Sequence, residues 1–155
     1  MSALLTISAA LAMHPALGGA SFAWSRLLAA LATRTKRIGP ATGLPALGAA
    51  WQRGFASPKQ VPVTAVTADT VLARIDTPCP LRGTGRTAAC WRMMEYDRAV
   101  AAAAGGQFVV LESQAEPGVT ACRVALRLAG QPMDDLVPAH IRAPEAGLRG
   151  RALRS

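Results

Sequence analysis

Between residues 61 and 129, segments with the pattern of strands alternate with a segment that has the pattern of a helix. Two strands are expected at 61–66 and 70–76, because β-branched and apolar residues alternate there around a short polar turn. Two more are expected at 108–112 and 122–128, on either side of a loop with a Pro-Gly turn. Connections this short join antiparallel strands, so the pattern predicts an antiparallel sheet.

A helix is expected between the two strand pairs. Thr87 can cap its first turn, and the Gly105-Gly106 pair can end it near Ala104. Helical spacing places Cys90, Met93, Met94, Asp97 and Ala101 on one inward face. The predicted fold is therefore α+β, in the order β-β-α-β-β, with the helix packed on one face of the antiparallel sheet.

The chain of 155 residues is 51% hydrophobic, which is enough for one core. Residues 1–38 are apolar and basic, and we interpret them as a helical segment that is either a leader or a cover for the core. Repeated Gly and Pro indicate a linker at 39–60, with a short helix around 46–55. The α+β domain is expected at 61–141, followed by a flexible basic tail at 142–155.

Charge is distributed unevenly along the sequence. The formal net charge is +8, yet residues 1–68 contain no Asp or Glu, so the basic excess lies mostly there. The α+β part lacks the interleaved aromatic and basic residues of nucleic-acid surfaces, which excludes nucleic acid as the expected partner. The apolar run 3–13 and the amphipathic stretch 22–37 instead indicate peripheral membrane contact through residues 1–37. We therefore expect the protein to lie in the cytoplasm or to be associated with a membrane surface.

The three cysteines, Cys79, Cys90 and Cys122, are candidate metal ligands. Their odd number and the lack of a secretory signal pattern argue against a disulfide framework. Strand alternation would place Glu112 on the same side as Phe108 and Val110, facing the helix. Two thiolates and a carboxylate are donors that Zn²⁺ takes, and Cys79 could add a fourth. The alternative is that Cys90 and Cys122 are small core hydrophobes.

The order of these residues resembles the four-vinyl-reductase domain family, in which small sensor domains bind hydrophobic or aromatic ligands and some hold zinc. The shared features are a helix Cys, a Gly-Gly turn, a Val-rich strand that ends in Glu, and a closing Cys. The resemblance implies that Cys90, Glu112 and Cys122 are zinc ligands, although a further family cysteine near Gln114 is absent. It also implies a ligand cavity between helix and sheet.

A second resemblance is to the L-2-amino-thiazoline-4-carboxylic acid hydrolase family. Cys79-Pro80, Cys90, Asp97 and the spacing from Gly118 to Cys122 are similar to its pattern, while Met94 replaces a usual cysteine. This likeness implies a metal-assisted hydrolase of small amide- or thiazoline-like substrates, with Asp97 as the catalytic proton carrier. In the ligand-binding interpretation, Met94 and Asp97 would face the cavity.

Gly83 and Gly85, with Ala88, match the G-x-G-x-x-A pattern of dinucleotide-binding folds. The strand does not run directly into the first glycine, so that fold is not expected. The backbone N–H groups at this helix start could still hold a carboxylate or phosphate together with Arg82 and Arg86. The alternative is a plain turn with two solvated arginines.

Three functions remain open from the sequence. The first is a small ligand-binding domain with a Cys/Glu metal site between helix and hairpin. The second is the metal-assisted hydrolase, so the sequence leaves open whether the chain is an enzyme. The third is an interaction module without a site, whose N-terminal part docks on a membrane or a partner.

Overall fold

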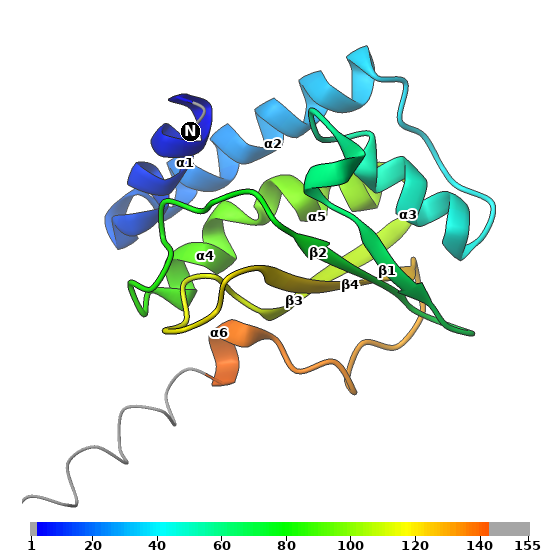
Figure 1. Cartoon of the computed structure of the whole chain (residues 1–155). Coiled ribbons are helices and arrows are strands. Elements are labelled where there is room, and N and C mark those ends of the chain that lie inside the picture. The colour runs from blue at the N-terminus through cyan, green and yellow to red at the C-terminus, as the bar shows by residue number, and fades with distance from the viewer. Residues whose placement is uncertain (1–2, 143–155) are drawn as a thin grey trace, which may run out of the picture.

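A computed structural model describes residues 3–142, so the expected tail lies outside the described residues from position 143 onward. Its centre is a four-stranded antiparallel sheet, in the spatial order β1-β2-β4-β3 (Figure 1). The strands are β1 (Val63–Val66), β2 (Val71–Ile75), β3 (Gly106–Glu112) and β4 (Cys122–Leu128). With helices on the sheet and a helical N-terminal segment, the predicted α+β class is confirmed.

The predicted central helix is two helices, α4 (Thr87–Met93) and α5 (Glu95–Ala103). Met94 stands between them with ψ 7°, although its N–H still donates to the Cys90 carbonyl at 2.9 Å. The two halves pack differently: α4 packs against α1 (Ala3–Met13) and one part of α2 (Gly18–Thr35), whereas α5 packs along α2. Because α1 and the segment leading through α2 are bent by 111° relative to one another, a straight helix could not follow both.

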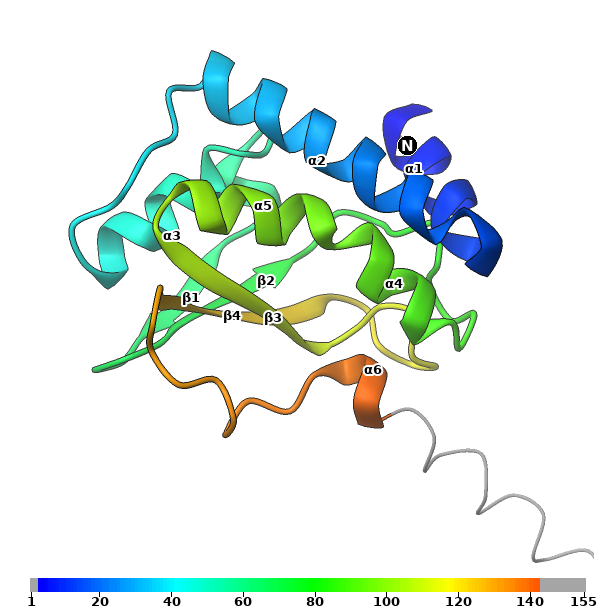
Figure 2. The same ribbon diagram turned by 180° about the vertical axis from the view of Figure 1, so that it is seen from behind.

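Helices α1 and α2 form an outer layer on the side of α4 and α5 that faces away from the sheet (Figures 1 and 2). The Trp24 Nε1–H group donates to Ser8 Oγ at 3.1 Å and joins the two helices. A short 3₁₀ turn, Pro15–Leu17, connects them. Within residues 3–142 no single helix is long and apolar enough to cross a membrane, and only the bent α1–α2 pair meets that criterion together.

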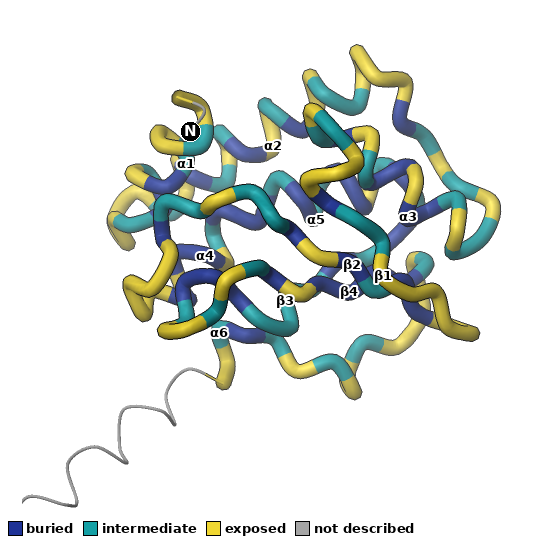
Figure 3. Tube along the Cα trace, viewed as in Figure 1, coloured by how far each residue is buried: buried dark blue, intermediate teal, exposed yellow. Residues whose placement is uncertain are grey.

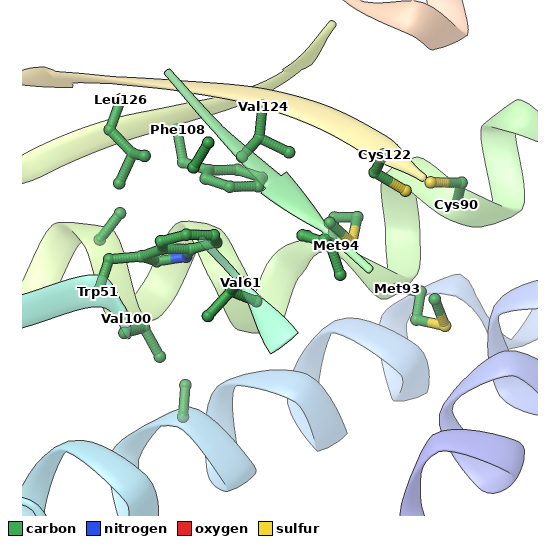
Figure 4. Packing of buried hydrophobic residues seen from close by; sticks show 14 of the residues in the cluster. Trp51, Val61, Cys90, Met93, Met94, Val100, Phe108, Cys122, Val124 and Leu126 are labelled. Carbon is green, nitrogen blue, oxygen red and sulfur yellow. The ribbon is translucent and has the colours of Figure 1, made fainter. Parts of the chain in front are cut away.

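The segment predicted as a linker contributes instead to the core. It contains α3 (Leu44–Gln52) and a 3₁₀ turn at Pro58–Gln60. Leu47 and Trp51 of α3 are completely buried, and the Trp51 ring lies 5.9 Å from that of Phe108 (Figure 4). Of the Gly and Pro residues that suggested a linker, Gly43 and Pro45 stand at the start of α3, where Pro in the first turn is compatible with a helix, and Gly48 lies within it.

The opposite face of the sheet is partly covered by the segment after β4, which ends in α6 (Ala139–Arg142) (Figure 1). Arg127 of β4 fastens this segment: its Nη1 and Nη2 donate to the two carboxylate oxygens of Asp135 at 2.6 and 2.7 Å. Its Nε donates to Thr70 Oγ1 at 2.8 Å. Figure 3 shows that the most deeply buried positions lie between the sheet and the helices.

Gly106 provides a test of this packing. A Cβ atom at Gly106 would lie 2.6 Å from Leu47 Cδ1 and 2.9 Å from the Arg127 carbonyl oxygen. We expect Gly106→Ala to lower the free energy of unfolding by about 1–3 kcal/mol, as overpacked sites do, in urea denaturation. In Gly19→Ala, the matched control on α2, the added Cβ meets nothing within 4 Å. Equal stability of the two variants would contradict the close approach of α3 to β3.

Candidate functional site

A cavity of about 450 Å³ opens between the α4–α5 helices, strand β3 and the C-terminal segment 133–140. Its lining combines Trp91, Arg98 and Ala102 of the helices, residues 106–110 of the strand, and Leu136 and His140 of the C-terminal segment. Most of these side chains are apolar. The cavity therefore lies at the edge of the sheet, where three parts of the chain that are distant in sequence come together.

Strand β3 contributes its unpaired edge to the cavity. Among the strands of residues 3–142, it pairs with β4 alone. The Ala129 N–H group donates to the Gly105 carbonyl at 2.9 Å, next to the Gly106–Leu128 pair. Because antiparallel pairing alternates, the N–H and C=O groups of Gly106, Phe108 and Val110 point away from β4. All three residues line the cavity, so a ligand there meets backbone donors and acceptors.

Trp91 forms an aromatic wall that other side chains hold in place. Its ring centroid lies 5.3 Å from that of His140 and 5.3 Å from that of Phe22, the latter in an edge-on contact. The Arg98 guanidinium carbon lies 4.9 Å from the Trp91 ring centroid. Because Trp91 is 40% exposed, one part of the indole remains available to a planar or apolar molecule.

The charged groups at the cavity are compensated. The Arg98 Nε atom donates to Glu95 Oε2 at 2.9 Å, and its Nη2 atom donates to the Trp91 carbonyl at 2.7 Å. Burial, together with the nearby Arg98 charge, lowers the pKa of His140 below its usual value. The imidazole is therefore mostly neutral at pH 7. These groups favour a ligand without net charge.

Cys90 and Cys122 come together between α4 and the start of β4, with their side chains pointing toward one another (Figure 4). Burial raises the pKa of Cys90 to about 11 and the pKa of Cys122 to about 12, so both are neutral thiols at pH 7. The Gln114 N–H group donates to Cys122 Sγ at 3.3 Å. Cys79 is only half-buried, and its sulfur accepts from the Leu81 N–H at 3.4 Å.

The prediction that Glu112 faces the helix is wrong. A β-bulge between Val110 and Glu112 shifts the register, so that Glu112 stands opposite Arg123, and its Oε1 atom accepts from Arg123 Nη1 at 2.8 Å. One extra residue in a strand turns the following side chain to the other face. Within the described part of the chain, no three His, Cys, Asp or Glu side chains are placed to hold a metal ion. Glu112 does not join the cysteines, and zinc binding stays a prediction.

Asp97 and Met94 lie in the core and do not line the cavity. The Trp51 Nε1–H group donates to Asp97 Oδ1 at 3.3 Å, and burial raises the pKa of Asp97 to about 7. The space between helix and sheet where a ligand was expected is occupied by Trp51 and Phe108 (Figure 4). The proton carrier of the hydrolase interpretation is thus shielded from a substrate at the sheet edge.

The glycine-rich turn before α4 is held by bonds within the protein. The Gly83 N–H group donates to the Gln114 carbonyl and the Gly85 N–H group to the Ala115 carbonyl, both at 2.8 Å. Arg82 Nη2 donates to Gln114 Oε1 at 2.7 Å and to the Thr120 carbonyl at 2.9 Å. Arg82 therefore fastens two loops. Arg86 is exposed and directly precedes α4, so the predicted anion site keeps neither glycine N–H as a donor.

Sequence reasoning missed most of the residues that form the cavity: of the predicted site residues, Cys90 alone lines it. Neither Trp91 nor His140 is among the site residues predicted from the sequence. No local pattern marks either residue as a ligand contact, because the cavity exists only once β3 is the sheet edge and the 133–140 segment folds back. No family model, curated protein or solved structure matches the chain, so the fold and the cavity carry the functional argument.

Asp97 makes stability depend on pH. Its pKa of about 7 in the folded chain exceeds the value of about 3.9 expected when unfolded. Between these values the folded state retains a proton that the unfolded state has lost, so stability falls as pH rises. We expect the free energy of unfolding, measured in urea, to be about 2 kcal/mol lower at pH 7 than at pH 5, at about 1.4 kcal/mol per pH unit with the group half titrated at pH 7. Asp97→Asn should remove this part of the slope; an unchanged slope would show that Asp97 does not titrate there.

The thiols should differ in reactivity. With pKa values of about 11 and 12, Cys90 and Cys122 hold little thiolate at pH 8, and both are buried. We expect Cys79 to react first with Ellman's reagent, and the other two about 100-fold more slowly or only on unfolding. In the Cys79→Ser variant the fast phase should disappear. Rapid modification of two thiols in folded Cys79→Ser would contradict the burial of this pair.

Proposed function

We propose that the chain is a binding domain for a small, uncharged and largely apolar molecule, which occupies the cavity beside β3. The observation that carries this proposal is an apolar cavity of about 450 Å³ with compensated charges. Ligand pockets usually measure about 300–1,000 Å³ and combine apolar walls with a few polar groups. This cavity has the same size and character.

Three kinds of contact would recognise the molecule. The exposed part of the Trp91 indole offers a surface for an aromatic or planar group. The outward backbone groups of Phe108 and its neighbours offer hydrogen bonds at the strand edge. The neutral His140 imidazole provides one donor and one acceptor. A molecule with an aromatic part and one or two polar groups uses all three.

The resemblance to four-vinyl-reductase domains agrees with this ligand class, since the members of that family bind hydrophobic or aromatic molecules. The ligand would lie at the edge of the sheet, and not in the helix–sheet interior that the resemblance implied. The proposal requires no metal. The hydrolase alternative gains no support here, because Asp97 is buried against Trp51 and does not line the cavity.

Filling the cavity tests the proposal. Ala102 is exposed on α5 and lines the cavity, so a leucine at 102 would occupy ligand space with little effect on the core. We expect the full chain to bind the neutral dye Nile red with an increase in fluorescence, and Ala102→Leu to weaken binding at least tenfold. The matched control is Ala88→Leu, because Ala88 is exposed on α4 and does not line the cavity.

Two results would overturn the proposal. One is equal dye affinity of Ala102→Leu and the unmodified chain, which would place the dye elsewhere. The other is the absence of saturable binding of any neutral aromatic probe. Thermal melts of both leucine variants establish that a loss of binding does not come from unfolding.

A further inference from the structure

Helix α2 has an unusual orientation. It buries small residues, Ser21, Ser25 and Ala29, on the face that packs against the rest of the molecule. It exposes two leucines instead, with 62% of Leu27 and 60% of Leu31 accessible to solvent. A helix on the surface of a soluble domain normally turns its large apolar residues inward. The exposed leucines therefore indicate a surface that a partner covers.

The neighbouring elements extend this apolar surface. Leu4 and Ile7 of α1 and Leu17 of the connecting turn are also exposed, each by more than 40%. We refer to Leu4, Ile7, Leu17, Leu27 and Leu31 together as the outer apolar face. Helices α1 and α2 lie together on the side of the molecule opposite the sheet (Figures 1 and 2), and the Trp24–Ser8 hydrogen bond joins them. The face is therefore carried by two helices held in a fixed relation.

The charges around this face are positive. Arg34 follows Leu31 by three residues and shares its side of α2, and Lys36 and Arg37 follow at the helix end; all three are exposed. The chain has no Asp or Glu before Asp69. Glu95, which accepts from Arg26 Nε at 2.6 Å, is buried beneath the helix layer. An apolar surface flanked by cations and free of its own carboxylates matches an anionic lipid surface.

We propose that the outer apolar face binds the surface of an anionic membrane. The five apolar side chains enter the interface, and Arg34 and Arg37 lie against lipid phosphates, whereas Lys36 Nζ donates to the Phe55 carbonyl oxygen at 2.6 Å. A second copy of this chain fits the face less well, because it would bring the same positive charges together. Docked in this way, the chain keeps its sheet, and the C-terminal segment that walls the cavity, on the side away from the lipid.

Vesicle sedimentation tests the proposal with the full chain. We expect binding to vesicles of phosphatidylglycerol and phosphatidylcholine to be at least tenfold stronger than to pure phosphatidylcholine, and to weaken as salt is raised. The double variant Leu27→Ser/Leu31→Ser should lose at least tenfold in affinity. The matched control is Val66→Ser, because Val66 is 44% exposed on β1 at a distance from the face. Arg34→Gln/Arg37→Gln should reduce the preference for the anionic lipid.

Several results would overturn the proposal. The absence of sedimentation with anionic vesicles is one, and unchanged binding of the double leucine variant with its fold intact by circular dichroism is another. Light scattering provides the third: a dimer in solution that Leu27→Ser/Leu31→Ser converts to a monomer would assign the face to a second copy. The dye-binding cavity lies on other elements, so its outcome is independent of these results.

Discussion

Trp51 connects the helices to the sheet at the centre of the core. Its fully buried ring contacts Phe55 at 5.0 Å and Phe108 at 5.9 Å between ring centroids, and its N–H donates to Asp97. Through these contacts, Trp51 joins α3, α5 and β3. The indole, together with Phe108, occupies the centre of the helix–sheet interior. The cavity lies instead at the sheet edge.

The cavity also depends on a second interaction, on the other side of the sheet. Arg127 binds both carboxylate oxygens of Asp135, and Asp69 lies within 3.3 Å of its Nη2 atom. A bidentate bond of this kind fixes direction as well as distance. It holds the chain after β4 across the sheet and so brings Leu136 and His140 to the cavity. The helix–sheet core forms one wall of the cavity, and the C-terminal segment held by Arg127 forms the other.

The strands could be predicted from local patterns, because the alternation of apolar and polar residues and the residues that favour turns each involve only a few neighbouring positions. The same rules failed where a distant contact decides the outcome. The bulge before Glu112 inserts one residue and turns that side chain to Arg123, and no residue in the strand signals it. The breakers at 39–60 resemble a linker, yet Trp51 anchors that segment in the core. The convergence of Cys90 and Cys122 followed from the two patterns, whereas the cavity required the strand order.

The unpaired edge of β3 has a consequence for the chain at high concentration. Outward N–H and C=O groups on a strand edge form a template to which a strand from another molecule can add. Here the same edge lines the cavity, and Phe108 and Val110 on it belong to a segment of high β-propensity. A molecule seated in the cavity would occupy those groups. Ligand binding would therefore also protect the protein from edge-to-edge aggregation.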